Sequence, residues 1–435
     1  MSLDTVRADH LSCYGYPRIT SPNLDQFAAG GAVFTDCIST HIPTHPAHTC
    51  MMTGRDPFET GVIAQGGHTA PGSDVVMLAE ELQRQGYFTA AADNLGRWFT
   101  RGFSLYEVYQ WEIKPGEPMR KAEGVNKSAL KALHRCADQD QPFFLFLHYW
   151  DGHTPYLPPP PFDRMFYKGD EKDPDNPSMD ALWDFEPFNR YFAGWMPGVT
   201  DIQFPIAQYD ASLAYLDSCL QHLFNRMEQL GLLENTSVVI TADHGEETDE
   251  HECWFDHHGL YDTNLRVPLL VRTPGGSPQR IPGFVRTLDI APTILDLSGA
   301  SPFAAPLQGA SFRPMLEGAW PAGQGTCDEL FLTECTWMRK RGYRSGRYKY
   351  IQALEPDIHG KPPEELYDLE HDPGEKHNLA FELPSVAADL KRRLMAWKTD
   401  REAASGRADP VETQRISLKR IGDPKTPVIR RGSVS

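Results

Sequence analysis

Apolar runs and amphipathic segments alternate between residues 1 and 324. The run Phe143–Tyr149 (FFLFLHY) is continuous, as in a strand buried on both faces, and Val267–Arg272 is of the same kind. Helical spacing of apolar residues marks 74–85 and 207–230. Further strands are predicted at 33–38, 87–92 and 237–241, and further helices at 22–29 and 288–297. This alternation predicts an α/β fold with a large, mostly parallel central sheet flanked by helices.

Two regions depart from this alternation. Residues 157–205 are rich in Pro, Asp and aromatic residues, and we predict a lid-like insertion with partly ordered turns. After residue 325, short runs at 330–335, 344–352 and 365–369 predict antiparallel strands, followed by a helix at 384–398. We therefore expect a large domain over 1–324, a smaller C-terminal α+β subdomain with an antiparallel sheet over 325–402, and an extended or disordered tail over 403–435.

Composition narrows the class of protein. The chain has 435 residues, and its formal net charge of −17 argues against binding of a nucleic-acid duplex, because phosphate backbones require a basic face. Eight cysteines are scattered without CxxC spacing, which predicts reduced thiols. The sequence contains neither an apolar run long enough for a membrane span nor a recognisable signal peptide, so a cytoplasmic location is expected.

The stretch Thr40–Arg55 contains a hydroxyl in an unusual position. Pro43 fixes the approach of the chain, and Pro46 suits the first position of a helix, which places Thr44 at the helix N-terminus. Free N–H groups and the helix dipole at such an end favour an anionic group. Because a hydroxyl is a poor nucleophile unless a base or a metal removes its proton, Thr44 as a nucleophile requires a partner.

Candidate metal ligands lie at the ends of predicted strands. Asp243 and His244 follow the strand at 237–241, and Asp4 follows Met1–Leu3, which is a short run for a secure strand. With Thr44, these residues are expected to converge at one edge of a parallel sheet and to hold one divalent cation. Carboxylate and imidazole together favour manganese or zinc, with calcium and magnesium as alternatives. Asp-His-Gly alone is also a common solvated turn.

Several motifs, in chain order, resemble the sulfatase family of the alkaline phosphatase superfamily. They are Ser2–His10, Ser21–Asp25, Thr53–Arg55, Asp243–Glu246, Arg266–Leu269, and Glu365–Leu369 with Asp372–Gly374. The resemblance reaches from the first residue to about Leu379. It implies an alkaline phosphatase-like sandwich fold and a metal-dependent hydrolase that acts on a small anionic ester. Whether the chain forms a homo-oligomer stays open.

The nucleophile position differs from the usual family pattern. Family sulfatases carry Cys or Ser in C/S-x-P-x-R and oxidise it to formylglycine, whereas the matching stretch here is Thr44-His45-Pro46-Ala47-His48. Threonine cannot give that aldehyde, so no formylglycine is expected. The resemblance then favours members with an unmodified threonine, such as phosphodiesterases and phosphonate monoester hydrolases, although some proteins named sulfatases carry the same pattern.

Three further histidines are candidates for the site, and the resemblance places two of them. His153 matches the position that binds the anionic group of the substrate, and His257 replaces a lysine. His257 and His258 are predicted to assist catalysis by protonating the leaving oxygen, with a surface or capping role as the alternative. A second metal at Asp151, His153 and His258 is a further alternative, as in the two-metal phosphodiesterases of the superfamily.

Further residues are assigned in the same way. Asn94 and Arg97 occupy a segment where the family carries a lysine and histidine pair, and we expect them to bind the anionic oxygens of the substrate. A surface salt bridge is the alternative for Arg97. His48 replaces the family arginine that supports the nucleophile and is predicted to orient Thr44; a buried helix histidine is the alternative.

These observations favour one function. We expect a hydrolase that cleaves phosphate, phosphonate or sulfate esters through a covalent threonyl intermediate on Thr44. The alternatives are a sulfatase proper, a phosphotransferase that passes the group to an alcohol, and a non-catalytic binding protein of the same fold.

Overall fold

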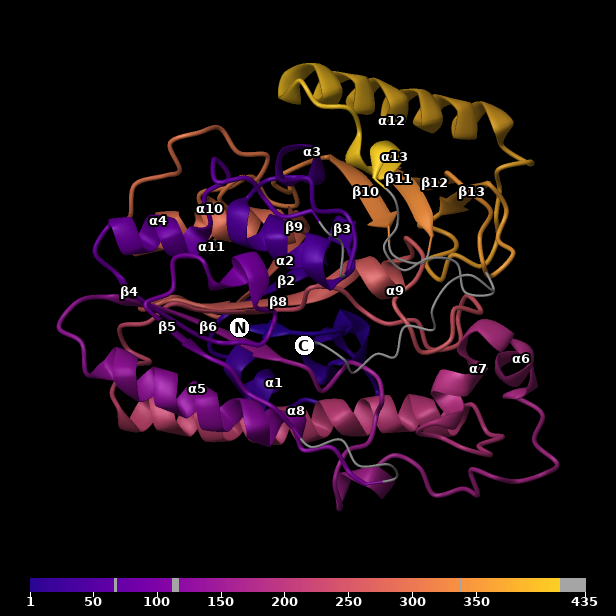
Figure 1. Ribbon diagram of the computed structural model, residues 1–435, viewed down its shortest axis with the longest axis horizontal. Coiled ribbons are helices and arrows are strands. Elements are labelled where there is room, and N and C mark those ends of the chain that lie inside the picture. The colour runs from indigo at the N-terminus through magenta and orange to yellow at the C-terminus, as the bar shows by residue number, and fades with distance from the viewer. Residues whose placement is uncertain (66–68, 112–116, 336–337, 415–435) are drawn as a thin grey trace.

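An eight-stranded sheet forms the centre of the structure (Figure 1). The structure is a computed structural model, and it describes residues 1–65, 69–111, 117–335 and 338–414. The strand order is β5-β4-β6-β1-β7-β8-β2-β9. The strands are β1 (Ser2–Leu3), β2 (Ala32–Ile38), β4 (Phe88–Ala92), β5 (Leu105–Glu107), β6 (Phe143–Tyr149), β7 (Val238–Thr241), β8 (Arg266–Arg272) and β9 (Gln279–Arg286). Only β8 runs antiparallel to its neighbours among these strands, so the predicted, mostly parallel sheet is confirmed.

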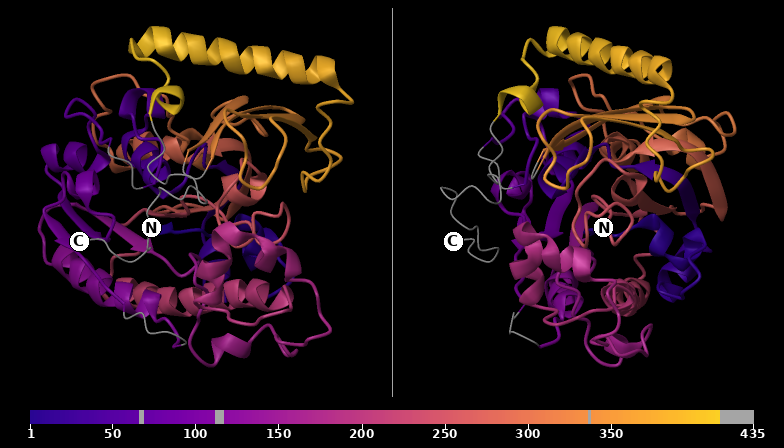
Figure 2. Two further views of the ribbon diagram at one scale, coloured as in Figure 1. Left: turned by 45° about the vertical axis from the view of Figure 1, so that its right-hand side comes forward. Right: turned by 90° about the vertical axis from the view of Figure 1, so that its right-hand side faces the viewer.

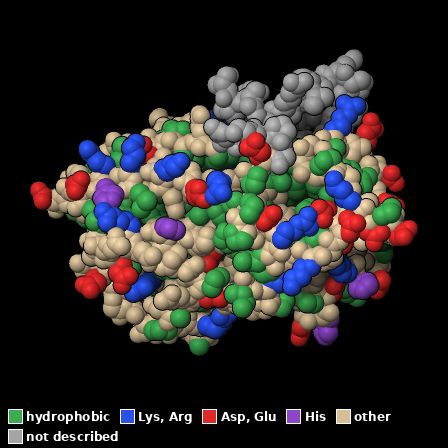
Figure 3. All heavy atoms as spheres, turned by 90° about the horizontal axis from the view of Figure 1, so that it is seen from below, with side chains coloured by type: hydrophobic (Ala, Val, Ile, Leu, Met, Phe, Trp, Pro, Cys, Tyr) green, Lys and Arg blue, Asp and Glu red, His purple; other side chains and the backbone are tan. Residues whose placement is uncertain are grey.

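Helices cover both faces of this sheet (Figure 1). On one face lie α1 (Pro22–Ala28), α5 (Lys121–Ala137) and α8 (Gln203–Gln229), and on the other lie α2 (Thr44–Thr53), α4 (Leu78–Arg84) and α10 (Ile290–Ser298). The apolar positions that predicted α8, namely Leu213, Leu216, Leu220 and Leu223, are all buried in the core. On the outer side of α5 and α8, basic and acidic side chains are interspersed (Figure 3).

A second, five-stranded sheet has the order β13-β12-β11-β10-β3. Its strands are β3 (His41–Ile42), β10 (Glu329–Cys335), β11 (Arg339–Ser345), β12 (Tyr348–Ala353) and β13 (Glu364–Asp368), and α12 (Pro384–Ser405) lies over it (Figure 2). The pairs from β10 to β13 are antiparallel, and β3 runs parallel to β10. Because β3 ends two residues before Thr44, the small sheet holds the segment that leads into α2.

Two predictions for the C-terminal part were wrong. Residues 344–352 were expected to form one strand, but Gly346 has a φ of +54° and turns the chain between β11 and β12. The tail was expected to be extended from residue 403, but α12 continues to Ser405 and α13 (Pro410–Thr413) buries Val411. The rest of that predicted tail, 415–435, lies outside the described residues.

The insertion at 157–205 carries short helices rather than turns alone. It contains η4 (Phe162–Arg164), α6 (Asp180–Asp184) and α7 (Glu186–Ala193). Figure 1 shows α6 and α7 at the right-hand side of the molecule, away from the labels of β4, β5 and β6. The smaller helices elsewhere are α3 (Pro57–Thr60), α9 (Asp262–Leu265) and α11 (Arg313–Leu316). Within the described ranges, no helix has the length and apolar character needed to cross a membrane, and all eight cysteines are free thiols.

Candidate active site

Three parallel strands in the middle of the large sheet end side by side. Ser2 of β1 is in register with His148 of β6 on one side and with Thr241 of β7 on the other. Asp4 follows β1 directly, while Asp243 and His244 follow β7. These side chains therefore meet at the carboxyl edge of the sheet, where open α/β sheets bind ligands.

Thr44 is the first residue of α2, whose ten residues are all buried. Pro43 caps this helix, and its carbonyl accepts a hydrogen bond from the Ala47 amide at 3.0 Å. Pro46 is thus the third residue of the helix, whereas the sequence predicted it at the first position. Proline is tolerated there because the first-turn amides have no partner within the helix. Thr44 still has the N-terminal position that its proposed role requires.

The predicted metal ligands form one buried group. Asp4, Asp243 and His244 each offer a ligand atom, and these atoms lie within 4.8 Å of one another. The Thr44 hydroxyl lies 3.2 Å from Nε2 of His244. The four side chains therefore lie close enough to share one coordination shell of two carboxylates, an imidazole and a hydroxyl.

Asp243 gives an independent indication of what this group binds. Its Oδ1 accepts a hydrogen bond from the Thr5 amide at 3.1 Å. Its Oδ2 is buried and has no hydrogen-bond partner among the described residues, and it lies 3.3 Å from Nε2 of His244. Since a buried carboxylate oxygen without a donor is costly, a cation at this position would satisfy it. The donor set and this oxygen both fit a divalent metal ion.

Thr5 holds the two carboxylates in place, which the sequence reasoning did not anticipate. Its hydroxyl donates to Oδ1 of Asp4 at 2.5 Å, and its amide donates to Asp243. Thr5 has a φ of +62°, a region that non-glycine residues rarely occupy. The hydroxyl of Tyr209 donates to the Thr5 carbonyl at 2.9 Å and so supports this conformation. Strained backbone of this kind is typical of functional sites.

His148 is a second residue that the sequence reasoning missed. It lies on β6, with Nε2 3.2 Å from Oδ2 of Asp4 and Nδ1 2.9 Å from Oδ1 of Asp93. Burial alone would lower the pKa of His148, but the hydrogen bonds to Asp4 and Asp93 raise it to about 9. Burial would likewise raise the pKa of Asp4, whereas the hydrogen bond from His148 brings it well below its ordinary value. The sequence did offer one indication of His148, because it is the only histidine in the apolar run FFLFLHY.

His48 contacts the backbone of Thr44 and not its hydroxyl. Its Nδ1 lies 3.0 Å from the Thr44 carbonyl and its Nε2 lies 2.9 Å from the Ser2 hydroxyl. Burial lowers the pKa of His48 to about 4, so the ring is neutral at pH 7. His48 therefore links the first turn of α2 to β1. This contact positions Thr44, in keeping with the predicted supporting role, through the main chain.

Of the three remaining histidines, His257 lies against the metal-ligand group, and the other two lie near His257. The rings of His257 and His244 stack with centroids 4.4 Å apart, and His153 lies 5.4 Å from His257. His258 is further out, 6.2 Å from His257, and packs against Phe188 of the insertion. His257 thus directly adjoins the candidate ligands, while His258 borders the insertion.

Asp151 is not grouped with His153 and His258 among the described residues whose candidate ligand atoms lie within 4.8 Å of one another. It accepts a hydrogen bond from the Ala122 amide, and burial raises its pKa to about 7 while the charge of Lys121 opposes this. Lys121 also donates to the carbonyls of residues 150, 153 and 155. The second buried group of candidate ligands among the described residues is instead Glu246, Asp256 and His257.

Asn94 and Arg97 lie on the surface beside α2. Both are exposed, and the guanidinium of Arg97 stacks 4.4 Å from the ring centroid of Trp98. Trp98 donates through Nε1 to the hydroxyl of Thr49 on α2. Burial and the charge of Arg97 lower the pKa of His45, which follows Thr44, to about 4. Arg97 therefore lies near His45, the residue that follows Thr44, whereas the described contacts of Asn94 do not include the metal-ligand group.

Comparison with known proteins gives two family matches. The sulfatase family model matches residues 2–300, and the model of the C-terminal part of N-sulphoglucosamine sulphohydrolase matches residues 249–400. Together they cover both sheets.

Individual relatives are distant but extend over most of the chain. Human arylsulfatase A is 29% identical over 92% of this chain and 87% of its own length. The N-acetylglucosamine-6-O-sulfatase of Bacteroides thetaiotaomicron is 24% identical over 96% of this chain and 88% of its own length. The crystal structure of the phosphonate monoester hydrolase of Agrobacterium radiobacter superimposes with a TM-score of 0.73 at 22% identity and covers 92% of this chain and 95% of the other. That structural likeness concerns the fold.

Proposed function

This chain belongs to the sulfatase family, and from that membership we propose that it is a metal-dependent hydrolase that cleaves phosphate or phosphonate esters with Thr44 as nucleophile. The family places it among hydrolases of phosphoric and sulfuric ester bonds. The observation that carries the finer proposal is the 3.2 Å contact between the Thr44 hydroxyl and His244 within a buried group of metal-binding side chains.

Asp4, Asp243, His244 and Thr44 would hold the cation. When bound, a divalent ion lowers the pKa of a coordinated hydroxyl and neutralises charge on the substrate oxygens. Thr5 and His148 fix the orientation of Asp4, and Thr5 also fixes Asp243. His48 holds the main chain of Thr44.

The proposed reaction has two steps. Thr44 Oγ1 releases its proton to solvent as it bonds to phosphorus, the bond from phosphorus to the ester oxygen breaks, and the departing alkoxide takes a proton from His257, which regains one from solvent. Water then cleaves the threonyl ester and regenerates Thr44. His257 suits this role because it lies against His244 and beside the carboxylate of Asp256, whose Oδ1 lies 3.2 Å from its Nδ1.

Thr44 also supports the choice of substrate class. Water can displace an unmodified alcohol such as threonine from phosphorus. Release of sulfate by elimination instead requires the hydrate of the formylglycine aldehyde, which threonine cannot form. Phosphonate monoester hydrolases are among the structural neighbours of this chain. A sulfate ester is therefore the second candidate, favoured by the sulfatases among the relatives.

The test compares turnover of bis-p-nitrophenyl phosphate, p-nitrophenyl phenylphosphonate and p-nitrophenyl sulfate. We expect the phosphorus esters to be hydrolysed faster than the sulfate ester. Thr44→Ala should lose at least about a thousandfold in kcat, because the nucleophile is removed, and Thr44→Ser should retain most of the activity.

Thr49→Ala is the matched control, because Thr49 lies on the same buried helix and its hydroxyl bonds the His45 carbonyl at 2.6 Å. This variant should lose some stability but keep its turnover. Full activity of Thr44→Ala would exclude Thr44 as the nucleophile, and a faster reaction with the sulfate ester would assign the chain to the sulfatases proper.

A further inference from the structure

Lys121 is a buried cation that has no part in the two proposed steps. It is the first residue of α5, which lies beside α8 on one face of the large sheet (Figure 1). Lys121 is only 4% exposed. Because a buried ammonium is costly unless hydrogen bonds and opposite charges compensate it, its contacts show what it holds in place.

All three of the hydrogen bonds that Lys121 donates go to the loop of residues 150–155, which follows β6. Its Nζ lies 3.2 Å from the carbonyl oxygen of Trp150, 2.5 Å from that of His153 and 3.3 Å from that of Pro155. An ammonium has three N–H donors, so these contacts use its full capacity. Three carbonyl groups of one short loop thus converge on one cation, which fixes the path of the loop between them.

Carboxylates around Lys121 supply the opposite charge. Asp151 of the same loop accepts a hydrogen bond from the Ala122 amide through Oδ1, while its Oδ2 is buried without a hydrogen-bond partner in the described part of the chain. Burial lowers the pKa of Lys121 to about 8, and the charge of Asp151 is the largest that opposes this decrease. Asp4 and Glu246 oppose it as well. The ammonium is therefore the main form at pH 7.

The helix that carries Lys121 is itself fixed to its neighbours. Asn126, also on α5, accepts a hydrogen bond from the Tyr149 hydroxyl at 2.7 Å and donates to the Cys219 carbonyl at 2.8 Å. Tyr149 is the last residue of β6, and Cys219 lies on α8. The first turn of α5 is therefore a rigid support from which Lys121 can hold the loop.

The loop held by Lys121 carries His153 beside the candidate active site. Nδ1 of His153 lies 2.8 Å from the Thr154 carbonyl, so the main chain of the loop orients the ring. The ring centroid lies 5.4 Å from that of His257. On the other side, the hydroxyl of Tyr191 on α7 donates to the Thr154 hydroxyl at 2.8 Å. A shift of the loop would therefore move His153 relative to the metal-ligand group.

We propose that Lys121 is a positioning residue for substrate binding, which holds His153 where its ring can donate to the anionic oxygens of the ester. This role rests on the proposed function, because it concerns the same phosphate or phosphonate substrate. Without the ammonium, three loop carbonyls lose their donor, and the loop must rearrange to satisfy them. The metal ligands should stay in place, since Thr5 and His148 hold them.

The test measures binding of phenylphosphonate to the Mn²⁺-loaded protein by isothermal titration calorimetry. In Lys121→Met, we expect the Kd to rise at least about tenfold, because charge-assisted hydrogen bonds that position the site are lost. The KM of p-nitrophenyl phenylphosphonate should rise by a similar factor. The kcat should change by less than about threefold, since a contact to a non-reacting oxygen is made equally in the ground state and the transition state.

Lys131→Met is the matched control. Lys131 lies on the same helix, its side chain is 68% exposed, and it pairs with Glu107. This variant should change neither the Kd nor the KM.

A double-mutant cycle with His153→Ala separates positioning from a general loss of structure. If Lys121 acts through His153, Lys121→Met should change the Kd by less than about twofold in the His153→Ala background. An equal rise in both backgrounds, or an unchanged Kd in Lys121→Met, would overturn the proposal. Lys121→Gln keeps two N–H donors without the charge and takes the place of Lys121→Met if that variant does not fold.

The same measurements separate this role from the proposed function. Binding of phenylphosphonate requires no nucleophile, so the cycle stays valid even if Thr44→Ala retains full activity. An unchanged Kd in His153→Ala would overturn the role of Lys121 and leave Thr44 as the nucleophile. Absence of binding to the wild-type protein would overturn it too, whereas the turnover of Thr44→Ala decides the nucleophile separately.

Discussion

His148 donates through Nε2 to Oδ2 of Asp4 over 3.2 Å, and both side chains are fully buried. The opposite ring nitrogen lies 2.9 Å from Oδ1 of Asp93. A carboxylate only accepts hydrogen bonds, so the imidazole carries both protons and is a cation between two anions. His148 thereby fixes the Asp4 carboxylate in the orientation that points toward Asp243 and His244. Residues behind a metal ligand in this way usually tune its affinity.

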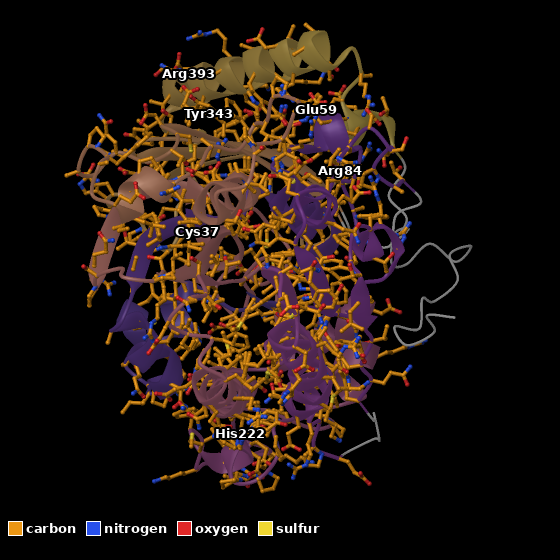
Figure 4. The ribbon with its side chains drawn as sticks, turned by 90° about the vertical axis from the view of Figure 1, so that its left-hand side faces the viewer. Cys37, Glu59, Arg84, His222, Tyr343 and Arg393 are labelled. Atoms are coloured by element: carbon orange, nitrogen blue, oxygen red, sulfur yellow. The ribbon has the colours of Figure 1, made fainter. Side chains whose placement is uncertain are left out.

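Replacing His148 should therefore weaken metal binding without removing a ligand. In His148→Gln, one amide donor can reach only one of the two carboxylates. We expect the Kd for Mn²⁺ to rise by about 10- to 100-fold, measured by isothermal titration calorimetry on the metal-free protein. His222→Gln is the matched control, because His222 is exposed on α8 (Figure 4). Wild-type affinity in His148→Gln would show that His148 does not position Asp4.

Removal of the metal should lower both activity and stability. A ligand present at 100 times its Kd stabilises the folded state by about 2.7 kcal/mol, so chelation should lower Tm. Mn²⁺ or Zn²⁺ should restore turnover better than Ca²⁺, because His244 contributes a nitrogen ligand. Asp243→Asn should lose the metal-dependent rise in Tm. His371→Asn, in a further group of which Glu370 and His371 are exposed and Asp368 is buried, should keep it; loss in both variants would contradict the assignment of the site.

The fold could largely be predicted from the sequence because its strongest patterns are long. β6 has the predicted bounds Phe143–Tyr149, and α8 differs from the predicted helix by a few residues. α5 was missed because its buried face combines alanines with polar residues such as Asn126 and Ser128, which interrupts the apolar periodicity. The turn between β11 and β12 was missed because one glycine interrupts a run with strand character on both sides.

The site could be predicted only where strand ends carry recognisable side chains. Asp4, Asp243 and His244 follow apolar runs directly, and the parallel sheet brings them together. Asp93 and His148 are distant in sequence from those residues, and their contacts depend on side-chain packing that no periodicity reveals. Distances between histidines on separate loops are equally hidden, which is why Glu246 and Asp256 were not predicted to group with His257.

The small sheet contains a buried ionic group whose cation should be essential for stability. Nζ of Lys340 lies 2.6 Å from Asp357 and 3.3 Å from Glu365, and the lysine is 1% exposed. Burial raises the pKa of the neighbouring Glu334 to about 8, while the charge of Lys340 opposes this. Lys340→Met leaves buried carboxylates without a cation and should cost about 3–5 kcal/mol, measured by urea denaturation.

Lys391→Met is the control for Lys340. Lys391 pairs with Glu364 at the surface of the same sheet, with 40% and 38% of the two side chains exposed. Its loss should cost less than about 1 kcal/mol. Equal costs for the two variants would show that burial does not determine the contribution of these pairs.

The partly buried amine of Met1, which donates to the Val239 carbonyl at 2.7 Å, predicts a pH dependence of stability. Its pKa falls from 8.0 to about 5 on folding, so between these values the unfolded chain binds more protons and stability rises with pH. This shift lowers the free energy of unfolding by up to about 4 kcal/mol below pH 5. The loss disappears above pH 8, where the amine is neutral in both states. Acetylation of the amine should remove this part of the pH profile. Identical urea-unfolding profiles for the free and acetylated chains would contradict the burial of the amine.

Gly152 allows the loop after β6 to approach the end of β1, which makes it a sensitive test of the site geometry. A Cβ atom on Gly152 would lie 2.7 Å from the Asp4 carbonyl oxygen and 2.9 Å from that of Thr5. Both contacts are with backbone, so the loop or the strand end must move. Gly152→Ala should therefore lower stability by about 1–3 kcal/mol and weaken Mn²⁺ binding, because Asp4 shifts. Gly374→Ala, where the nearest side-chain atom is 3.8 Å away, should change neither. Unchanged Mn²⁺ affinity in Gly152→Ala would mean that the loop moves and the metal-ligand group does not.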